Sequence, residues 1–332
     1  MTWCCGASAR CSAKARGKAV RLVFCVTPRF AVPTLEALLA AGHEIALVVT
    51  QPDRPVGRAQ EVVAPPVKQS ALAAGLTVIQ PDKIRNNAEF RAELEAIAPD
   101  AIVVVAYGRI IPPWMLALPR LGCINLHASR LPKYRGAAPI QWAVAMGETV
   151  TGNTTILLEE GLDTGPILLQ QQLPIAPEQT AADLFDVLAK AGAPLMVETL
   201  AGLADGSIHP QPQDHSLATL APLLDREDGR MDFAAHTAAE LKNRWRGFQP
   251  WPGAFTSLDG RKLIVHRMDV AEPASGTSAA PGEIRIEDHR LFVACARGTR
   301  LELTELQLEG KKRLGAAEFL RGLQLAHGAR LG

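Results

Sequence analysis

Residues 20–50, VRLVFCVTPRFAVPTLEALLAAGHEIALVVT, contain a strand, a helix and a second strand in succession. The β-branched and aromatic run at 20–25 predicts a buried strand, and Leu35, Leu38 and Leu39 follow on one face of a helix. Gly42 is placed where a glycine commonly ends a helix, and residues 44–50 predict another buried strand. Continuous apolar strands that alternate with helices form parallel sheets covered on both faces, so this stretch predicts an α/β fold.

The same alternation continues to about residue 127. We expect helices at 64–75 and 87–100 and apolar strands at 76–80, 101–107 and 122–126. The prediction is a doubly wound, mostly parallel, Rossmann-like sheet, in which ligands bind beyond the carboxyl ends of the strands. Asn125 and His127 lie at such an end.

The second half of the chain has a different pattern. Residues 151–177 predict two strands joined by EEGLDTG (159–165), and helices are expected at about 180–190, 193–205 and 237–246. Several short strands after residue 250 predict a small β-barrel, OB-like in form, or a sandwich. The predicted organisation is a disordered tail at 1–19, a catalytic domain at 20–206, a linker at 207–222 and a C-terminal domain at 223–332. The tail is basic and free of acidic residues, so a targeting peptide is the alternative.

Composition excludes several classes of protein. The chain has 332 residues, of which 48% are hydrophobic and 21% charged, as expected of a two-domain protein of the cytoplasm. No apolar run approaches the roughly 20 residues of a membrane span. The six cysteines form no C-x-x-C pair, which argues against a zinc site, any other metal site and a disulfide framework. Phosphate-binding glycine motifs are absent from the sequence, which argues against nucleotide hydrolysis.

The segment CINLHASRLPKYRGAAPIQWA (123–143) concentrates polar groups after a buried strand. Because successive side chains of a strand point to opposite faces, those of Asn125 and His127 lie on the same face. From Arg109 to Arg135 there are five basic residues and no acid, which favours an anionic ligand. Taken singly, a histidine at a strand end or Asp163 in a glycine-rich turn is more often structural, so a surface loop is the alternative to an active site.

Seven stretches together resemble the methionyl-tRNA formyltransferase family: FCVTPRFAVPTLEALL, TQPDRPVGR, VVVAYGRIIP, GCINLHASRLPKYRGAAPIQWA, EEGLDTG, GFQPWPGAF and LQLEGKKRL. The N-x-H and D-T-G set is shared with other enzymes that use 10-formyltetrahydrofolate. The resemblance implies that Asn125, His127 and Asp163 are catalytic. An amide and an imidazole can donate hydrogen bonds to the oxyanion formed when an amine attacks a formyl carbon, and Asp163 can orient the histidine and relay the proton.

The resemblance also implies the ligands and their contacts. Folate should contact the loop after the strand and the backbone of the preceding strand end, namely Ser129, Arg130, Leu131 and Pro132, and Val105, Tyr107 and Gly108. Initiator methionyl-tRNA should contact Arg58 in the loop around Arg54, and Lys311, Lys312 and Arg313 in the C-terminal domain. The net charge of only +1 means that tRNA recognition has to be local. A monomer is expected.

Three places depart from the family's usual pattern: Val26 and Arg29 in the first strand-to-helix turn, Arg130 in the folate segment, and the AQEVVAPP stretch after Arg58. We expect the Arg130 stem to cover apolar surface while its guanidinium stays in water. Two other functions stay open from the sequence. One is formyl transfer to a small amine or hydrolysis of the formylfolate, and the other is a catalytically weak relative that binds tRNA or folate.

Overall fold

The computed structural model describes residues 19–56, 61–272, 279–322 and 329–332. Apart from Ala19, the predicted tail lies outside the described residues, and so does Arg58. The chain divides into two compact units. The first comprises residues 1–126, 155–160 and 193–211, and the second comprises residues 127–154, 161–192 and 212–332.

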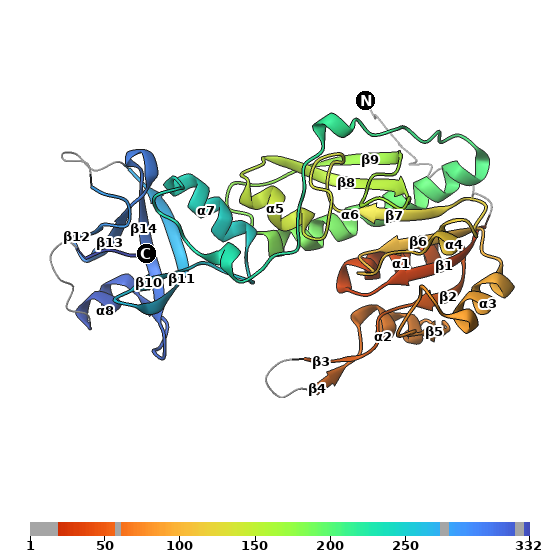
Figure 1. The fold of residues 1–332 in the computed structure, drawn as a ribbon, viewed down its shortest axis with the longest axis horizontal. Helices are drawn as coiled ribbons and strands as arrows, with labels where there is room; N and C mark the ends of the chain where they lie inside the picture. The colour runs from red at the N-terminus through yellow and green to blue at the C-terminus, as the bar shows by residue number, and fades with distance from the viewer. Residues whose placement is uncertain (1–18, 57–60, 273–278, 323–328) are drawn as a thin grey trace, which may run out of the picture. The chain divides into compact units, whose positions relative to one another are not determined.

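A seven-stranded sheet forms the α/β part of the fold (Figure 1), and its strand order is β5-β2-β1-β6-β7-β8-β9. The pairs β1–β2, β1–β6, β2–β5 and β6–β7 are parallel. The strands are β1 (Arg21–Val26), β2 (Glu44–Val49), β5 (Val78–Ile79), β6 (Ala101–Val105), β7 (Cys123–His127), β8 (Val150–Leu157) and β9 (Ile167–Pro174). The predicted doubly wound, mostly parallel sheet is confirmed.

Three helices of the first unit lie where the sequence predicts them, namely α1 (Val32–Ala40), α2 (Pro66–Ala73) and α3 (Ala88–Ile97). Asn87 caps α3 by accepting from the Phe90 amide, and Phe90 and Leu94 are the buried face of that helix. The short helix α4 (Pro113–Leu116) was not predicted. Neither was the hairpin of β3 (Arg54–Val56) and β4 (Glu61–Val63), which projects from this unit (Figure 1).

One long helix, α6 (Ala181–Asp205), replaces the two helices expected at 180–190 and 193–205. That prediction was wrong because Pro194 does not end the helix. Leu184, Leu188, Met196 and Leu200 are all buried, and this continuous apolar stripe outweighs the backbone bond that proline removes. Contrary to our expectation that no segment could span a membrane, α6 is long and apolar enough to do so. Half of its most apolar stretch, however, is buried in the protein. It is placed as a core helix.

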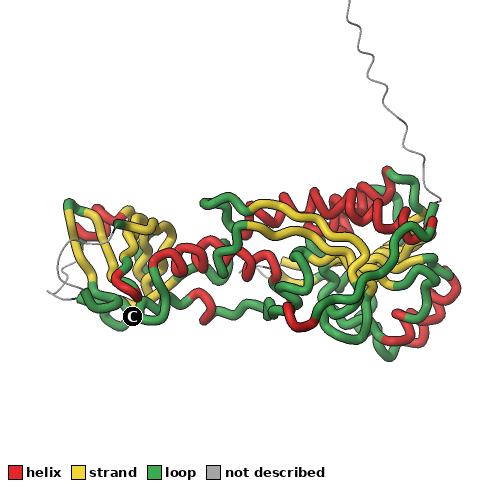
Figure 2. Tube along the Cα trace, turned by 90° about the horizontal axis from the view of Figure 1, so that it is seen from above, coloured by secondary structure: helices red, strands yellow, loops and turns green. Residues whose placement is uncertain are grey.

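The C-terminal part is an antiparallel half-barrel of six strands in the order β10-β11-β14-β13-β12, with β15 on β14. The strands are β10 (Phe255–Leu258), β11 (Arg261–Ala271), β12 (Ile284–Glu287), β13 (Arg290–Ala294), β14 (Arg300–Leu308) and β15 (Leu314–Gly315). Helix α7 (Ala238–Gly247) starts with a capping box of Thr237 and Glu240. A final helix, α8 (Ala316–Arg321), was not predicted. The C-terminus lies among these strands in both views (Figures 1 and 2), and Ser257 Oγ donates to the Gly332 carbonyl at 2.6 Å.

The segment between α6 and α7, residues 206–237, is extended, with only two short helical turns, η2 (His215–Leu217) and η3 (Glu227–Gly229). It pairs with the loop after β7. The Arg135 amide donates to the Thr219 carbonyl at 2.8 Å, and the Ala221 amide donates to the Arg135 carbonyl at 2.7 Å. The segment that the sequence predicts as a linker therefore supports the site described next.

Candidate active site

His127 is the last residue of β7, and only 5% of it is exposed. Its Nε2 lies 2.8 Å from the Tyr134 carbonyl oxygen. A carbonyl oxygen can only accept, so Nε2 carries a proton and donates in this contact. The orientation of the ring is thereby fixed, and Nδ1 is the nitrogen that faces the turn between β8 and β9.

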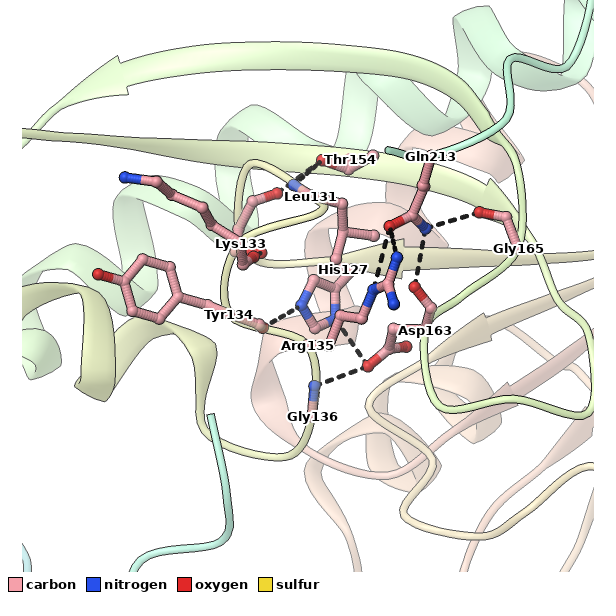
Figure 3. Close-up of polar contacts among 11 residues, drawn as sticks. His127, Leu131, Lys133, Tyr134, Arg135, Gly136, Thr154, Asp163, Gly165 and Gln213 are labelled. Atoms are coloured by element: carbon pink, nitrogen blue, oxygen red, sulfur yellow. Dashed lines mark hydrogen bonds and ion pairs between the residues drawn. The ribbon is translucent and has the colours of Figure 1, made fainter. Parts of the chain in front are cut away.

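Asp163 faces that nitrogen from the turn between β8 and β9 (Figure 3). Its Oδ2 lies 3.6 Å from His127 Nδ1, a distance for an ion pair but too long for a hydrogen bond. The Gly136 amide donates to the same oxygen at 2.9 Å. Asp163 has a φ of +50°, a left-handed conformation that aspartate tolerates better than most residues. The structure therefore brings together two residues that lie 36 positions apart in the sequence, as their predicted roles require.

Asn125 lies two residues before His127 on β7 and is 9% exposed. Alternation along the strand directs both side chains to one face. The Asn125 amide is therefore nearly buried, on the same face of β7 as the His127 imidazole.

The loop after β7 is held by its own hydrogen bonds. Ser129 is buried, and its Oγ donates to the Lys133 carbonyl at 2.6 Å. Thr154 Oγ1 donates to the Ser129 carbonyl at 2.6 Å and accepts from the Leu131 amide at 3.2 Å. Arg130 is exposed, as expected, while Leu131 is buried. Of the four predicted folate residues in this loop, Arg130 and Pro132 are therefore the ones whose side chains reach solvent.

Lys133 and Tyr134 point away from His127 (Figure 3). Both contact Glu148, where Lys133 Nζ and Tyr134 Oη each lie 2.9 Å from Oε1. Burial raises the pKa of Glu148, but the hydrogen bonds from Lys133 and Tyr134 outweigh it, so the net pKa lies below its ordinary value. Burial, with help from Glu148, raises the pKa of Tyr134. Lys133 and Tyr134 therefore brace the loop at neutral pH.

Comparison with known proteins identifies the family. Residues 20–200 match the formyl transferase family, and residues 223–324 match the formyl transferase C-terminal domain. A methionyl-tRNA formyltransferase of Acidobacterium capsulatum is 68% identical over 313 residues, which cover 94% of this chain and 100% of that protein. The chain belongs to the methionyl-tRNA formyltransferases. Another member, from Koribacter versatilis, is 57% identical over 311 residues, covering 94% of this chain and 98% of that protein. The resemblance drawn from the sequence motifs is confirmed.

Solved structures share the formyltransferase fold. The sugar 3N-formyl transferase WlaRD, solved in the presence of dTDP and 5-N-formyl-THF, aligns with a TM-score of 0.61 and 18% identity. The alignment covers 89% of this chain and 100% of WlaRD. HypX from Aquifex aeolicus, solved with tetrahydrofolic acid, gives a TM-score of 0.56 and 18% identity over 91% of this chain and 47% of HypX. At this identity the likeness concerns the fold.

A pocket of about 540 Å³ lies in the first unit, beside the loop that follows β6. Its wall includes three basic residues, two acidic ones and two adjacent apolar ones: Lys83, Arg85, Arg109, Asp82, Glu160, Ile110 and Ile111. Ile110 is 87% exposed. The sequence indicated Arg109 through its one-signed stretch, but nothing in the sequence marked Lys83, Arg85 or the exposure of Ile110.

The backbone after β6, which is predicted to contact the folate, has hydrogen-bond partners within the protein. The Tyr107 carbonyl accepts from Thr27 Oγ1 at 3.2 Å and from Gln51 Nε2 at 2.9 Å. Gln51 Nε2 also lies 3.4 Å from the Gly108 carbonyl. Val105 and Tyr107 are buried, at 0% and 1% exposure. These contacts fix the turn that leads into the pocket wall.

Two groups among the basic residues of the C-terminal part differ in their partners. Lys311 and Lys312 are exposed, and no hydrogen-bond or ion-pair partner for either ammonium occurs among the described residues, whereas Arg313 pairs with Glu305. The second group was not predicted. Lys262 Nζ lies 3.8 Å from the centre of the Phe255 ring, and the Arg230 guanidinium carbon lies 5.5 Å from the same ring. Burial and the nearby charge of Arg226 lower the pKa of Lys262.

Two cysteines of the α/β sheet, Cys25 on β1 and Cys123 on β7, are buried. Burial raises the pKa of Cys123 to about 12, and the pKa of Cys25 is raised well above its ordinary value for the same reason. Both thiols are therefore protonated at neutral pH and cannot act as thiolate nucleophiles. Within the described part of the chain, no group of three or more His, Cys, Asp and Glu residues could hold a metal ion.

Proposed function

We propose that the chain transfers the formyl group of 10-formyltetrahydrofolate to the amino group of initiator methionyl-tRNA, with Asn125, His127 and Asp163 as its catalytic residues. The observation that carries the proposal is the buried His127–Asp163 pair, completed by the Gly136 amide. It occurs in a chain whose match to methionyl-tRNA formyltransferases extends over 94% of its length.

The residues divide the chemistry between them. The folate supplies a formyl group bonded to N10, and attack by the amine leaves negative charge on the formyl oxygen. Asn125 through its amide and His127 through its ring donate hydrogen bonds to that oxygen, and loss of one such donor commonly costs about 10²–10³ in rate. Asp163 takes the proton that the amine nitrogen releases once it has bonded to the formyl carbon. The proton ends on N10 as the bond between N10 and the formyl carbon breaks.

The pocket beside β6 suits the donor. A folate has a flat heterocycle and an anionic glutamate tail, and Ile110, Ile111 and the three basic residues offer matching surfaces. Strands β6 and β7 are parallel neighbours, so their following loops leave the same edge of the sheet. We infer that the backbone of Val105, Tyr107 and Gly108 contacts the folate. The predicted folate contacts of the loop from Ser129 to Pro132, including Arg130 and Leu131, are also part of the proposal. No step of this chemistry requires a metal.

The acceptor RNA is expected to lie on basic surfaces of the chain. Lys311 and Lys312 are free to meet phosphates, and Arg313 lies beside them. Lys262 and Arg230, which lie over the Phe255 ring, and Arg226 near Lys262 are a second candidate surface, in which Arg230 is paired with Glu227. The predicted contact of Arg58 remains part of the proposal. An enzyme that acts on aminoacylated tRNA is expected in the cytoplasm, and we propose that it acts as a monomer.

The experiment is a formyl-transfer assay with the purified full-length chain and 10-formyltetrahydrofolate. Release of tetrahydrofolate is followed with methionyl-tRNA, free methionine, a sugar nucleotide amine or no acceptor. We expect turnover with methionyl-tRNA alone. Equal turnover with a small amine would instead support an activity like that of a sugar formyl transferase, and turnover without any acceptor would indicate a formylfolate hydrolase.

A further inference from the structure

Gln213 is the one buried residue between Gly206 and Leu220, a stretch that the structure describes in full. Its exposure is 6%, while its neighbours Pro212 and Asp214 are exposed. Burial of a single polar side chain in an otherwise solvated segment needs partners for its amide.

The partners of this amide include the catalytic turn. Gln213 Nε2 donates to the Asp163 carbonyl at 2.8 Å and to the Gly165 carbonyl at 2.7 Å (Figure 3). Both amide protons are thus used on the backbone of one turn. Gln213 Oε1 accepts from Arg135 Nε at 3.1 Å and from Arg135 Nη2 at 2.6 Å. The four hydrogen-bonding positions of the side chain are all occupied.

Arg135 anchors Gln213 from the loop after β7. Its exposure is 7%, and its Nη2 also donates to His215 Nδ1 at 3.1 Å. Its backbone pairs with Thr219 and Ala221. Hydrogen bonds hold both the backbone and the guanidinium of Arg135, so this arginine is a rigid support for Gln213.

The turn needs such support. Asp163 has a left-handed backbone, with a φ of +50°, which is less favourable for any residue other than glycine. Gly161 and Gly165 on either side add conformational freedom. A carboxylate on this turn keeps its place beside His127 only if the backbone carbonyls are fixed from outside.

We propose that Gln213 is a positioning residue for catalysis. It clamps the turn at 161–165 against Arg135, so that the Asp163 carboxylate stays beside His127 and the Gly136 amide. This inference rests on the proposed catalytic role of Asp163. It assigns a function in the reaction to the segment that joins the two domains.

The test replaces Gln213 by Met in the full-length enzyme, which keeps the size of the side chain and removes its polar atoms. We expect kcat to fall by about 10–100-fold, since a misplacement of about 1 Å can cost 10² in rate. The KM values for both substrates should stay within about twofold. The matched control is Gln211→Met, because Gln211 is exposed and donates only to the His209 carbonyl. Wild-type kcat in Gln213→Met would overturn the proposal.

A double-mutant cycle separates positioning from a merely structural role. In an Asp163→Asn background, Gln213→Met should lower kcat by no more than about twofold further, because both changes act on the same group. If the two losses multiply in full, Gln213 does not act through Asp163. If Asp163→Asn alone has near-normal kcat, the proposed catalytic role of Asp163 is wrong, and the positioning role of Gln213 is wrong with it.

A second variant covers the case in which Gln213→Met does not fold. Gln213→Glu keeps the acceptor for Arg135 but turns an oxygen toward the Asp163 and Gly165 carbonyls. We expect a folded protein whose kcat loss matches that of the Met variant. Wild-type kcat in this variant would show that the two donated hydrogen bonds do not matter.

Discussion

Gly136 shows how a single residue shapes the site. Its φ is +122°, and a Cβ at this position would lie 2.6 Å from the Ala221 carbonyl oxygen. Only glycine lets the backbone pass this close while its amide donates to Asp163. The sequence shows RGAAP at this point but gives no sign that the chain has to approach another segment 85 residues later.

We expect Gly136→Ala to lower kcat by at least about tenfold and the free energy of unfolding by about 1–3 kcal/mol, through strain and the displaced amide. Turnover assays and urea unfolding measure the two effects. Gly310→Ala is the control, because Gly310 also has a positive φ but no heavy atom lies within 4 Å of the position that its Cβ would take. Equal effects of the two changes would mean that close approach to Ala221 is unimportant.

The three polar side chains should fail as a unit. Asn125→Ala, His127→Ala and Asp163→Asn are each expected to lower turnover by about a hundredfold or more, because oxyanion donors and acid–base groups contribute on that scale. Their combination should not multiply the losses. Asp259→Asn is the control, since Asp259 has a φ of +49° in an exposed hairpin turn. A folded Asp163→Asn enzyme with near-normal turnover would remove the mechanism.

At the scale of elements, regular structure is much easier to read from the sequence than the loops that make the site. Strands β1, β2, β6 and β7 follow from continuous apolar runs. Helix α6 was divided in two because local propensity places a break at Pro194, while burial along the whole helix decides otherwise. The roles of Gln213 and Arg135 could not be predicted, since their pairing joins residues 78 positions apart and leaves no periodic signal.

The loop after β7 should depend on Glu148. Replacing Glu148 by Gln weakens its bonds to Lys133 and Tyr134, so the free energy of unfolding should fall by about 1 kcal/mol at pH 7. Because the pKa of this carboxyl is depressed in the folded protein, its stabilisation is present above the unfolded value of about 4.3 and is lost as pH falls through the lower folded value. Urea unfolding at pH 7 and near pH 4 measures both. Glu93→Gln, an exposed change on α3, is the control.

The difference between Glu148→Gln and the wild type should therefore shrink toward pH 4, while Glu93→Gln stays near the wild type at both values. A difference that is the same at pH 7 and pH 4 would show that the charge of Glu148 does not brace the loop.

At the scale of the molecule, α7 links the half-barrel to elements of the second unit that precede it in sequence. A Cβ on Gly247 would lie 2.6 Å from the Ala145 amide, so glycine permits the close packing of α7 on α5 (Pro139–Ala145). Lys242 Nζ contacts Asp269 on β11 at 2.6 Å and Glu178 at 2.9 Å. Burial lowers the pKa of Lys242, but these hydrogen bonds raise it by more, so the lysine is charged at neutral pH. The half-barrel is thus joined to its unit by packing and by charge.

Removal of both free lysines should affect the RNA substrate selectively. We expect Lys311→Ala with Lys312→Ala to raise KM for methionyl-tRNA and to reduce the slope of log affinity against log salt by about 1–2, since each phosphate contact releases counterions. KM for the folate should not change. Lys190→Ala, an exposed lysine on α6, is the control. An equal rise of both KM values would contradict a direct contact with RNA.

The pairing of the loop at 134–138 with residues 219–221 has a consequence for how the enzyme is made. The Tyr134 amide donates to Thr219 Oγ1 across 85 residues of sequence. At about 5–20 residues per second, a ribosome needs roughly 4 to 17 seconds to synthesise that interval. The ribosome finishes β7, which ends at His127, long before the segment that carries Gln213 and Ala221 has emerged. A nascent chain therefore acquires a finished site only after the catalytic domain has been translated to its end and the first residues beyond it are free of the ribosome.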